Sequence, residues 1–203
     1  INKNYRGCFF TLHLEPEVAL MNFSPEFNNS FEAISWISKS LPADTLLVVK
    51  EQVHSFGVRS RWYYSQLNKI SNVVLANPES HSWDWIKRAS IVSTISGTVG
   101  VEAVHFNKPV VSFGMHQIIN HLPTVHYVSN FTETKEAVSN FLDSDISEEE
   151  YNASRISLEK AQLDSSFELA EYKYSHKRNQ LEMKMAEVAL RNLFIEYSDV
   201  ISL

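Results

Sequence analysis

The sequence predicts an α/β fold, in which a parallel sheet of about six strands is flanked by helices and followed by a C-terminal helical extension. Short runs rich in β-branched and aromatic residues alternate with helical patterns from residue 8 to about residue 142, as is typical of repeated strand–helix units. Of the 203 residues, 44% are hydrophobic, enough to bury one sizeable core.

Six segments have the composition of strands, and five have the periodicity of helices. The predicted strands are 8–14, 46–49, 72–75, 91–95, 109–113 and 125–128. The predicted helices are 30–40, 59–70, 82–89, 97–106 and 132–142. In the first helix Phe31, Ile34 and Ile37 recur at helical spacing before Pro42 ends it. Ser82 is the predicted N-cap of the third helix.

The pattern changes after Asp143, where the strand signals stop. Residues 147–150 have the composition of a helix start, and Leu181, Met185 and Val188 suggest an apolar helical face within residues 179–198. We therefore expect a Rossmann-like domain over residues 1–145 and a helical extension over residues 146–203. Because the first residue is Ile1 rather than Met, we expect that a preceding part of the protein has been removed.

Charge and cysteine content exclude several classes of protein. The net charge of −6 is unlike that of proteins that track nucleic-acid phosphates, so no nucleic-acid partner is expected. There is no apolar run of about 18 residues and no signal-peptide pattern, so we expect a soluble cytoplasmic protein. The single cysteine, Cys8, is expected to be a buried, inert thiol. Walker A, dinucleotide, nucleophile-elbow and zinc-protease motifs are absent.

The turn after the fourth predicted strand is the most informative segment. Hydroxyl and glycine residues stand where a helix begins, and a helix start exposes free N–H groups that suit a phosphate. Ser96 and Thr98 offer hydroxyl donors, Gly97 permits close approach of a ligand, and Glu102 follows one turn later, where it could accept hydrogen bonds from a ribose diol. The alternative is an ordinary helix N-cap.

Polar residues also follow the first two strands, at the same expected edge of the sheet. Lys50 and His54 are candidates to meet a phosphate or a base, with Glu51 orienting them. Glu15, preferred over Glu17, is a candidate base or stabiliser of an oxocarbenium-like centre. The alternatives are a surface histidine and a polar loop that merely ends a strand. Glu15 and His54 are the candidate catalytic residues.

Two further loops are expected at the same edge. Gly114 follows the fifth predicted strand and lets the chain turn towards the ligand cleft that is expected at this edge of the sheet, beside His116. Beyond the third strand, Ser80, His81 and Ser82 are candidates to line a base pocket. Trp83 and Trp85 are expected to pack the helix.

Together, several stretches resemble the capsule-polysaccharide synthesis and export family, which includes the Kdo transferases of capsule and lipopolysaccharide assembly. These stretches are Leu14–Glu17, Leu47–His54, Thr94–Ala103 and Lys108–Gly114. The resemblance covers roughly residues 8–130. Its most specific part is the S-G-T-x-G-x-E-A block followed by K-P-V and F-G.

The resemblance implies the second, nucleotide-sugar-binding half of a two-domain GT-B glycosyltransferase, with a missing N-terminal acceptor domain. The enzyme would transfer a sugar to a bacterial surface polysaccharide from a nucleotide-sugar donor, CMP-Kdo in the best-known branches, and would require no further cofactor. The resemblance also implies that Ser96, Gly97 and Thr98 lie near the phosphate of the donor and that Glu102 lies near its ribose. Peripheral association with the cytoplasmic face of the inner membrane fits such an enzyme.

One departure from the family pattern widens the choice of donor. The family shows Lys-Glu-His-Pro after the second strand, whereas here Lys50-Glu51 is followed by Gln52-Val53-His54. UDP- and GDP-sugars therefore stay open as donors. A nucleotide-sugar epimerase of the same architecture and a non-catalytic domain that binds a nucleotide or a partner are the alternative functions.

Overall fold

A computed structural model describes residues 7–15, 20–21, 24–27, 29–55, 57–143 and 145–165. The chain divides into two compact units, Ile1–Arg155 and Ile156–Leu203. The sheet and its helices belong to the first unit, and the second is described only over residues 156–165, where it is helical. The predicted domain limit after residue 145 stays a prediction, and the predicted apolar face within 179–198 lies outside the described residues.

All six predicted strands are present, and helices cover both faces of the sheet as predicted. The strands are β1 (Gly7–Thr11), β2 (Leu46–Lys50), β3 (Val73–Ala76), β4 (Ile91–Thr94), β5 (Val110–Ser112) and β6 (Val125–Tyr127). The α-helices are α2 (Ser30–Ser40), α3 (Arg61–Leu67), α4 (Ser82–Arg88), α5 (Val99–His105), α6 (Phe131–Asp143) and α7 (Glu148–Ser165). Short 3-10 helices are η1 (Pro25–Phe27), η2 (Val53–Ser55) and η3 (Ile118–His121).

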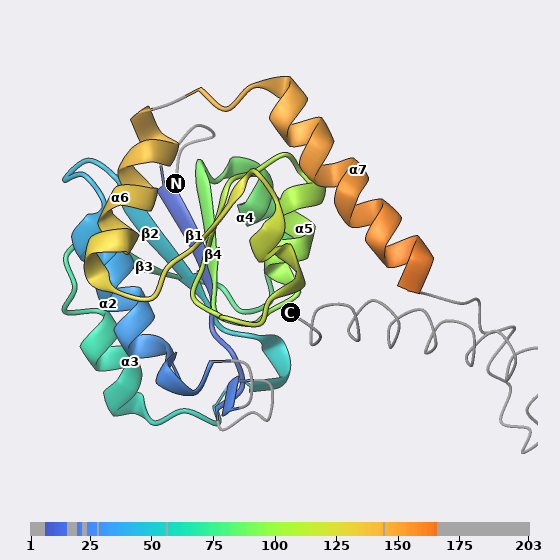
Figure 1. Cartoon of the computed structure of the whole chain (residues 1–203). Coiled ribbons are helices and arrows are strands. Elements are labelled where there is room, and N and C mark those ends of the chain that lie inside the picture. Colours follow the sequence, from blue (N-terminus) through green and yellow to red (C-terminus); the bar gives the residue numbers. More distant parts are fainter. Residues whose placement is uncertain are drawn as a thin grey trace, which may run out of the picture. The chain divides into compact units, whose positions relative to one another are not determined.

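The strands form one parallel sheet in the order β3-β2-β1-β4-β5-β6. The chain builds outwards from β1 to β3, then returns to the other side of β1 to add β4, β5 and β6. The strand order therefore reverses between β1 and β4, and open sheets of this kind bind ligands in the crevice at that point, beyond the carboxyl ends of the strands. In Figure 1 these ends point towards the lower part of the view.

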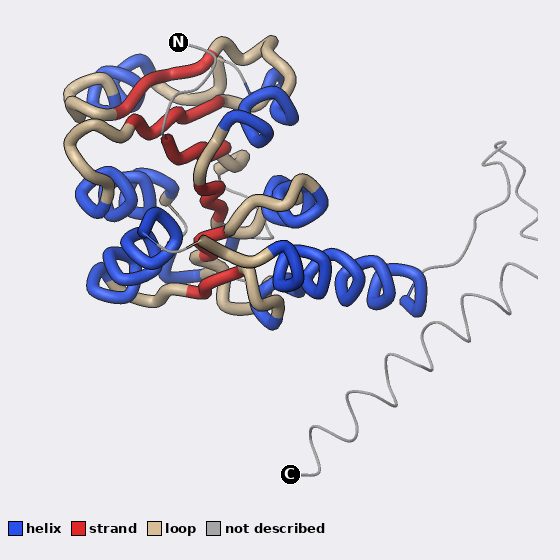
Figure 2. The backbone as a smooth tube through the Cα atoms, turned by 90° about the horizontal axis from the view of Figure 1, so that it is seen from above, coloured by secondary structure: helices blue, strands red, loops and turns tan. Residues whose placement is uncertain are grey.

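Helices lie on both sides of the row of strands (Figure 2). Residues of β1 alternate between the two sides. Phe10 joins a buried cluster with Ile34 of α2 and Val138 of α6, whereas Phe9 stacks on Trp85 of α4 with ring centroids 6.4 Å apart. Because both faces are covered, β1, β4 and β5 are buried along their whole length, as is usual for central strands of a parallel sheet.

The first strand is shorter than predicted. Pairing in β1 stops at Thr11, and Leu12 makes one last bond, from its N–H to the carbonyl of Lys50 at 2.8 Å. The segment from His13 onwards is therefore a loop at the carboxyl end of the sheet. The second predicted helix is also shorter, because Ser60 caps α3 with its side chain, and this leaves Arg59 in the loop before the helix.

The N-cap of α4 differs from the prediction. His81, not Ser82, is the N-cap, and its side chain accepts a hydrogen bond from the N–H of Trp83 at 3.3 Å. An unprotonated ring nitrogen one bond beyond the Cγ of histidine can accept a helix N–H in the same way as an Asn oxygen.

The start of α7 is anchored within the first unit. Ser147 and Glu150 bond each other reciprocally, from the N–H of Ser147 to Glu150 at 2.9 Å and from the N–H of Glu150 to Ser147 Oγ at 3.2 Å, which is a capping box. One turn further, the buried Ser154 Oγ accepts from both the N–H and the hydroxyl of Thr124. The helix start predicted at residues 147–150 is confirmed.

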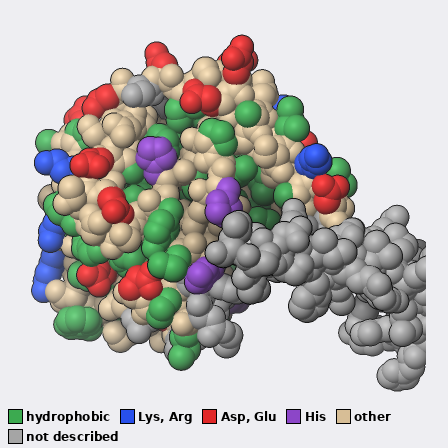
Figure 3. Space-filling model, in the orientation of Figure 1, with side chains coloured by type: hydrophobic (Ala, Val, Ile, Leu, Met, Phe, Trp, Pro, Cys, Tyr) green, Lys and Arg blue, Asp and Glu red, His purple; other side chains and the backbone are tan. Residues whose placement is uncertain are grey.

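The surface agrees with the acidic composition. On the face shown in Figure 3, carboxylates are scattered among apolar side chains, and Lys and Arg lie towards the edges of the view.

Candidate functional site

The loops after β1 and β4 are joined at the point where the strand order reverses. The N–H of Ser96 donates to Nε2 of His13 at 3.2 Å. The next residue, Gly97, packs so closely that a Cβ atom there would lie 3.0 Å from His13 Nε2 and 3.2 Å from Thr94 Oγ1. A side chain at this position would fit only if the imidazole of His13 or the side chain of Thr94 shifted by a few tenths of an ångström.

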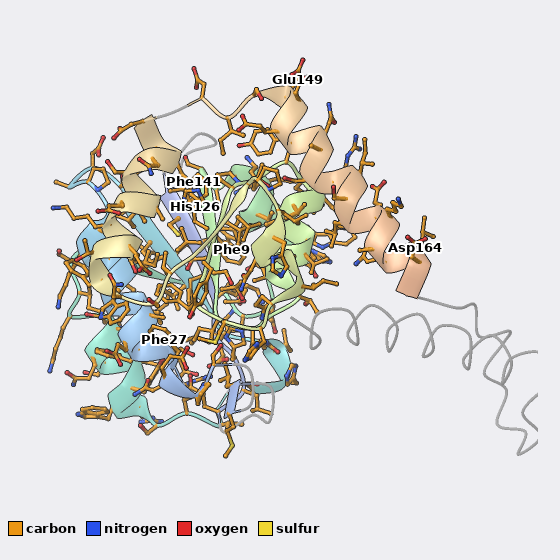
Figure 4. All side chains as sticks on the ribbon, viewed as in Figure 1. Phe9, Phe27, His126, Phe141, Glu149 and Asp164 are labelled. Carbon is orange, nitrogen blue, oxygen red and sulfur yellow. The ribbon has the colours of Figure 1, made fainter. Side chains whose placement is uncertain are left out.

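The loop after β5 packs against the same turn. A Cβ atom on Gly114 would lie 2.2 Å from the carbonyl oxygen of Ile95 and 2.9 Å from Ser24 Oγ. Phe27, which Figure 4 labels, packs its ring against that of Phe113, directly after β5, with centroids 4.9 Å apart. The loops after β1, β4 and β5 thus meet around the turn between β4 and α5.

The β4–α5 turn keeps polar groups available for a ligand. Within the described residues, the N–H groups of Thr98 and Val99 donate to no acceptor, and Thr98, the N-cap of α5, makes no side-chain cap bond. The buried Ser96 Oγ also has no partner among these residues. Glu102 lies one turn into α5, half-buried, and its carboxylate bonds to no described residue.

His13 is held as a neutral imidazole. Its side chain is 3% exposed, and burial, assisted by the positive charge of Arg59, lowers the pKa of His13 to about 4. Because Nε2 accepts a hydrogen bond, the proton of the neutral ring is on Nδ1. Nδ1 is buried and has no hydrogen-bond partner within the described part of the chain.

Arg59 connects the loops after β1 and β2. Its Nη1 donates to Glu51 Oε2 at 2.6 Å, and its Nη2 donates to the backbone carbonyl of His13 and lies 3.4 Å from Glu15 Oε1. The guanidinium also lies over the ring of Tyr63, 5.3 Å from its centroid. The two carboxylates favour the charged guanidinium and raise the pKa of Arg59 against the effect of burial.

The predicted residues Glu15 and Glu51 are both bound within this network. Glu15 Oε1 accepts from the N–H of Ser30 at 2.9 Å and from its hydroxyl, so the carboxylate sits at the start of α2. Glu51 accepts from the N–H of Gln52 at 2.9 Å and from the hydroxyl of Tyr64 at 2.8 Å. Burial and the bond to Glu51 raise the pKa of Tyr64 to about 12.

The other predicted residues are placed differently. Lys50 is buried at the end of β2, where its Nζ donates to the carbonyl of Glu51 at 3.2 Å; burial lowers the pKa of Lys50, and Glu51 opposes that effect. His54 in η2 and His116 after β5 are exposed. Glu17 lies outside the described residues. The structure therefore brings the residues after β1, β2 and β4 to one edge of the sheet, and the catalytic roles of Glu15 and His54 stay predictions.

An apolar cavity of about 200 Å³ lies beside the Arg59 network. It is lined by Leu12, Val49, Glu51, Tyr64, Leu75, Ala76 and Pro78. Among the residues that the structure describes, there is no cluster of three or more His, Cys, Asp or Glu that could hold a metal ion. In the same residues, no helix has the length and apolarity that crossing a bilayer requires.

His13 and Arg59 were not among the residues predicted for the candidate site. His13 falls within the run predicted as the first strand, where the pattern predicts a core residue. Arg59 falls within the run predicted as the second helix, where the pattern predicts that a basic residue lies on the surface. The signal that could have exposed Arg59 is Ser60, because a serine directly before an aromatic helical run is a good N-cap and places the residue before it in a loop.

Comparison with solved structures identifies the fold. No protein-family model and no curated protein matches the sequence. Over 79% of its length the chain matches 45% of UDP-GlcNAc 2-epimerase from Methanocaldococcus jannaschii, solved with UDP-GlcNAc and UDP, with a TM-score of 0.54 and 14% identity. It also matches the glycotransferase of kitacinnamycin, over 78% of this chain and 40% of that one, with a TM-score of 0.51 and 14% identity.

The fold is that of one half of a GT-B protein. This GT-B half is common to glycosyltransferases and UDP-GlcNAc 2-epimerases. KpsC of Thermosulfurimonas dismutans, a β-Kdo 2,7 transferase, is also similar, with a TM-score of 0.49 and 17% identity over 68% of this chain and 46% of that one. The chain spans less than half the length of these three structures.

Proposed function

We propose that this chain is the donor-binding half of a GT-B glycosyltransferase that transfers a sugar from a nucleotide-sugar to a bacterial surface polysaccharide. The observation that carries the proposal is the convergence of the loops after β1, β4 and β5 around the β4–α5 turn, at the reversal of strand order. Ligands of open α/β sheets bind at this place. The resemblance to the Kdo transferases indicates CMP-Kdo as the donor, with UDP- and GDP-sugars as competitors.

The turn has the groups that a nucleotide-sugar phosphate needs. Phosphate oxygens can accept hydrogen bonds from the N–H groups of Thr98 and Val99 and from the hydroxyls of Ser96 and Thr98. The positive, N-terminal end of the dipole of α5 favours negative charge at the same place. Glu102, one turn further on, can accept two hydrogen bonds from a ribose diol. Stabilisation of the departing nucleotide phosphate by these donors is the catalytic contribution that we assign to this half.

Glu15 and His54 are the residues that we propose to act on the sugar or its acceptor. The carboxylate of Glu15 is held in place by Ser30 and Arg59, so it suits stabilisation of an oxocarbenium-like centre. The exposed imidazole of His54 is suited to exchange a proton with the acceptor.

The edge of the sheet around this turn also suits contact with an acceptor domain. Several large apolar side chains in the loops and short helices that follow β1, β2 and β5 are exposed to solvent, Trp62 in α3 at 70% most of all. They are Leu14, Val53, Val58, Trp62, Met115 and Ile118. Exposed apolar groups gathered on one edge mark an interaction surface, and we propose that the acceptor half of the protein faces them.

The decisive experiment is a calorimetric titration of this chain with CMP, UDP and GDP. We expect saturable binding of one nucleotide, lost or weakened at least about ten-fold in Ser96→Ala and Glu102→Ala. Glu136→Ala is the matched control, because Glu136 is an exposed glutamate on α6, and it should bind as the wild type does. Absence of binding by all three nucleotides would contradict the proposal and favour a domain that docks a partner.

The second candidate is a nucleotide-sugar epimerase, which the match to the M. jannaschii enzyme favours. Incubation of the full-length protein with the donor identified by titration separates the two. A transferase consumes the donor only when a glycan acceptor is present, whereas an epimerase changes the donor sugar without one. A domain that only binds nucleotide turns over in neither case.

A further inference from the structure

We propose that Arg59 is a positioning residue that locks the loops after β1 and β2 together and thereby holds His13 against the β4–α5 turn. The inference rests on the proposed function, because the property that Arg59 is to control is nucleotide affinity at that turn. Arg59 itself is expected to make no contact with the nucleotide.

The contacts of Arg59 run in a continuous path towards the turn. Its Nη2 bonds the backbone carbonyl of His13, and the imidazole of the same residue accepts the N–H of Ser96 at 3.2 Å. Ser96 begins the turn in which the N–H groups of Thr98 and Val99 have no acceptor among the described residues. A displacement of the His13 backbone would therefore move the imidazole away from Ser96.

A second set of contacts fixes Arg59 from the other side. Glu51 accepts from Arg59 and from Tyr64 of α3, and Gln52 Nε2 donates to the carbonyl of Leu12 at 3.2 Å. Glu15 ties the same guanidinium to Ser30, the first residue of α2. The side chain of Arg59 is only 7% exposed, so these contacts are little screened by solvent.

The shape of the arginine side chain matters as much as its charge. The guanidinium reaches Glu51 with one terminal nitrogen, and reaches the His13 carbonyl and Glu15 with the other. A lysine ammonium is a single point of charge and cannot span these partners in the same geometry. A purely electrostatic role would be restored by lysine, whereas a positioning role would not.

The test compares Arg59→Lys and Arg59→Met with the control Arg61→Met, which removes the same charge from an exposed position two residues away. Nucleotide affinity is measured by calorimetry with CMP, UDP and GDP. We expect both Arg59 variants to bind about ten-fold more weakly or worse, as when a residue that orients a site is changed, and Arg61→Met to bind as the wild type does. Full affinity in Arg59→Lys would overturn the positioning role.

A second readout does not depend on the nucleotide. In the wild type the hydrogen bond to His13 shifts the amide proton of Ser96 downfield in NMR spectra, and we expect this proton to move upfield in Arg59→Met as the bond is lost. The pKa of His13 should rise in the same variant, because a nearby positive charge is removed. Unchanged Ser96 and His13 signals in a folded Arg59→Met would refute the inference.

The two readouts separate the inference from the proposed function. If the wild type binds none of the three nucleotides, the proposed function fails, and the Ser96 and His13 signals still decide the role of Arg59. If Arg59→Met does not fold, Glu51→Gln takes its place, because it removes the charge of one Arg59 partner and keeps a similar shape. Its expected effect on Ser96 is the same in direction, and an unchanged signal would count against the inference.

Discussion

The imidazole of His13 accepts the backbone N–H of Ser96 at 3.2 Å, which ties the end of β1 to the end of β4 where the strand order reverses. This bond requires an unprotonated Nε2, and burial holds the pKa of His13 at about 4. The two facts make the geometry of the candidate site sensitive to acid.

The free energy of unfolding should decrease as the pH is lowered, because of this histidine. An unfolded histidine has an ordinary pKa of about 6.5, so between pH 6.5 and pH 4 the unfolded chain binds the proton that the folded chain excludes. The stabilising effect of the neutral ring is complete above pH 6.5 and is lost as pH falls towards 4. The loss should reach about 3 kcal/mol. Urea unfolding of the wild type and His13→Gln from pH 4 to 8 measures it.

The glutamine variant keeps an acceptor for Ser96 but does not titrate. The difference in unfolding free energy between the two proteins should therefore change across this pH range. His116→Gln, at an exposed histidine, should follow the wild-type profile. Parallel profiles for the wild type and His13→Gln would show that His13 is not the group responsible.

A side chain at Gly114 should be poorly tolerated. A Cβ atom there meets the carbonyl oxygen of Ile95 at 2.2 Å, and that oxygen belongs to the backbone at the end of β4, which cannot retreat easily. We expect Gly114→Ala to cost roughly 3 kcal/mol, the upper part of the range for overpacking. Chemical denaturation measures the change.

Gly57→Ala is the comparison, because Gly57 has φ of +87° but open space around it. Backbone strain alone should cost about 1 kcal/mol there. An equal cost at the two positions would mean that the contact with Ile95 relaxes without penalty.

The buried bonds between Thr124 and Ser154 should anchor the start of α7. Ser154→Ala leaves the N–H and the hydroxyl of Thr124 without their partner at 3.2 and 3.0 Å, and a buried polar group that loses its partner costs about 1–3 kcal/mol. Ser157→Ala, at an exposed position on the same helix, should change stability by less than about 0.5 kcal/mol. Unfolding free energies in urea compare the two variants.

Cys8 should be unreactive in the folded protein. The thiol is fully buried in β1, and burial raises its pKa, so little thiolate is available to a reagent. Disulfide-exchange reagents should label it only as fast as the chain unfolds. Rapid labelling under native conditions would mean that the first strand opens locally.

Much of the fold could be predicted because its signals are local. Each strand is a short run of β-branched or aromatic residues, and each helix repeats apolar residues at helical spacing, so six strands and their flanking helices were predicted correctly. The ends were less accurate. Pairing in β1 stops at Thr11 because no partner strand continues beyond Lys50, and a local pattern does not contain that information.

Part of the layout of the candidate site could be predicted for the same reason. The turn around Ser96 and Gly97 and the loop at Gly114 carry glycine and hydroxyl signals that are visible in sequence, and the structure brings both loops to one edge of the sheet. Arg59 has no such signal, since its bond to His13 spans 46 residues and its bond to Glu51 spans eight. Its importance depends on which loops the sheet places next to it.

The sequence by itself therefore determined the α/β class, the approximate positions of the strands and helices, and the turn where a phosphate is expected. These follow from hydrophobic periodicity and from the backbone requirements of glycine, which act over a few residues. Only the tertiary structure decided the strand order, the neutral state of His13 and the network of Arg59, because strand order, burial and ion pairing are set by residues far apart in the chain.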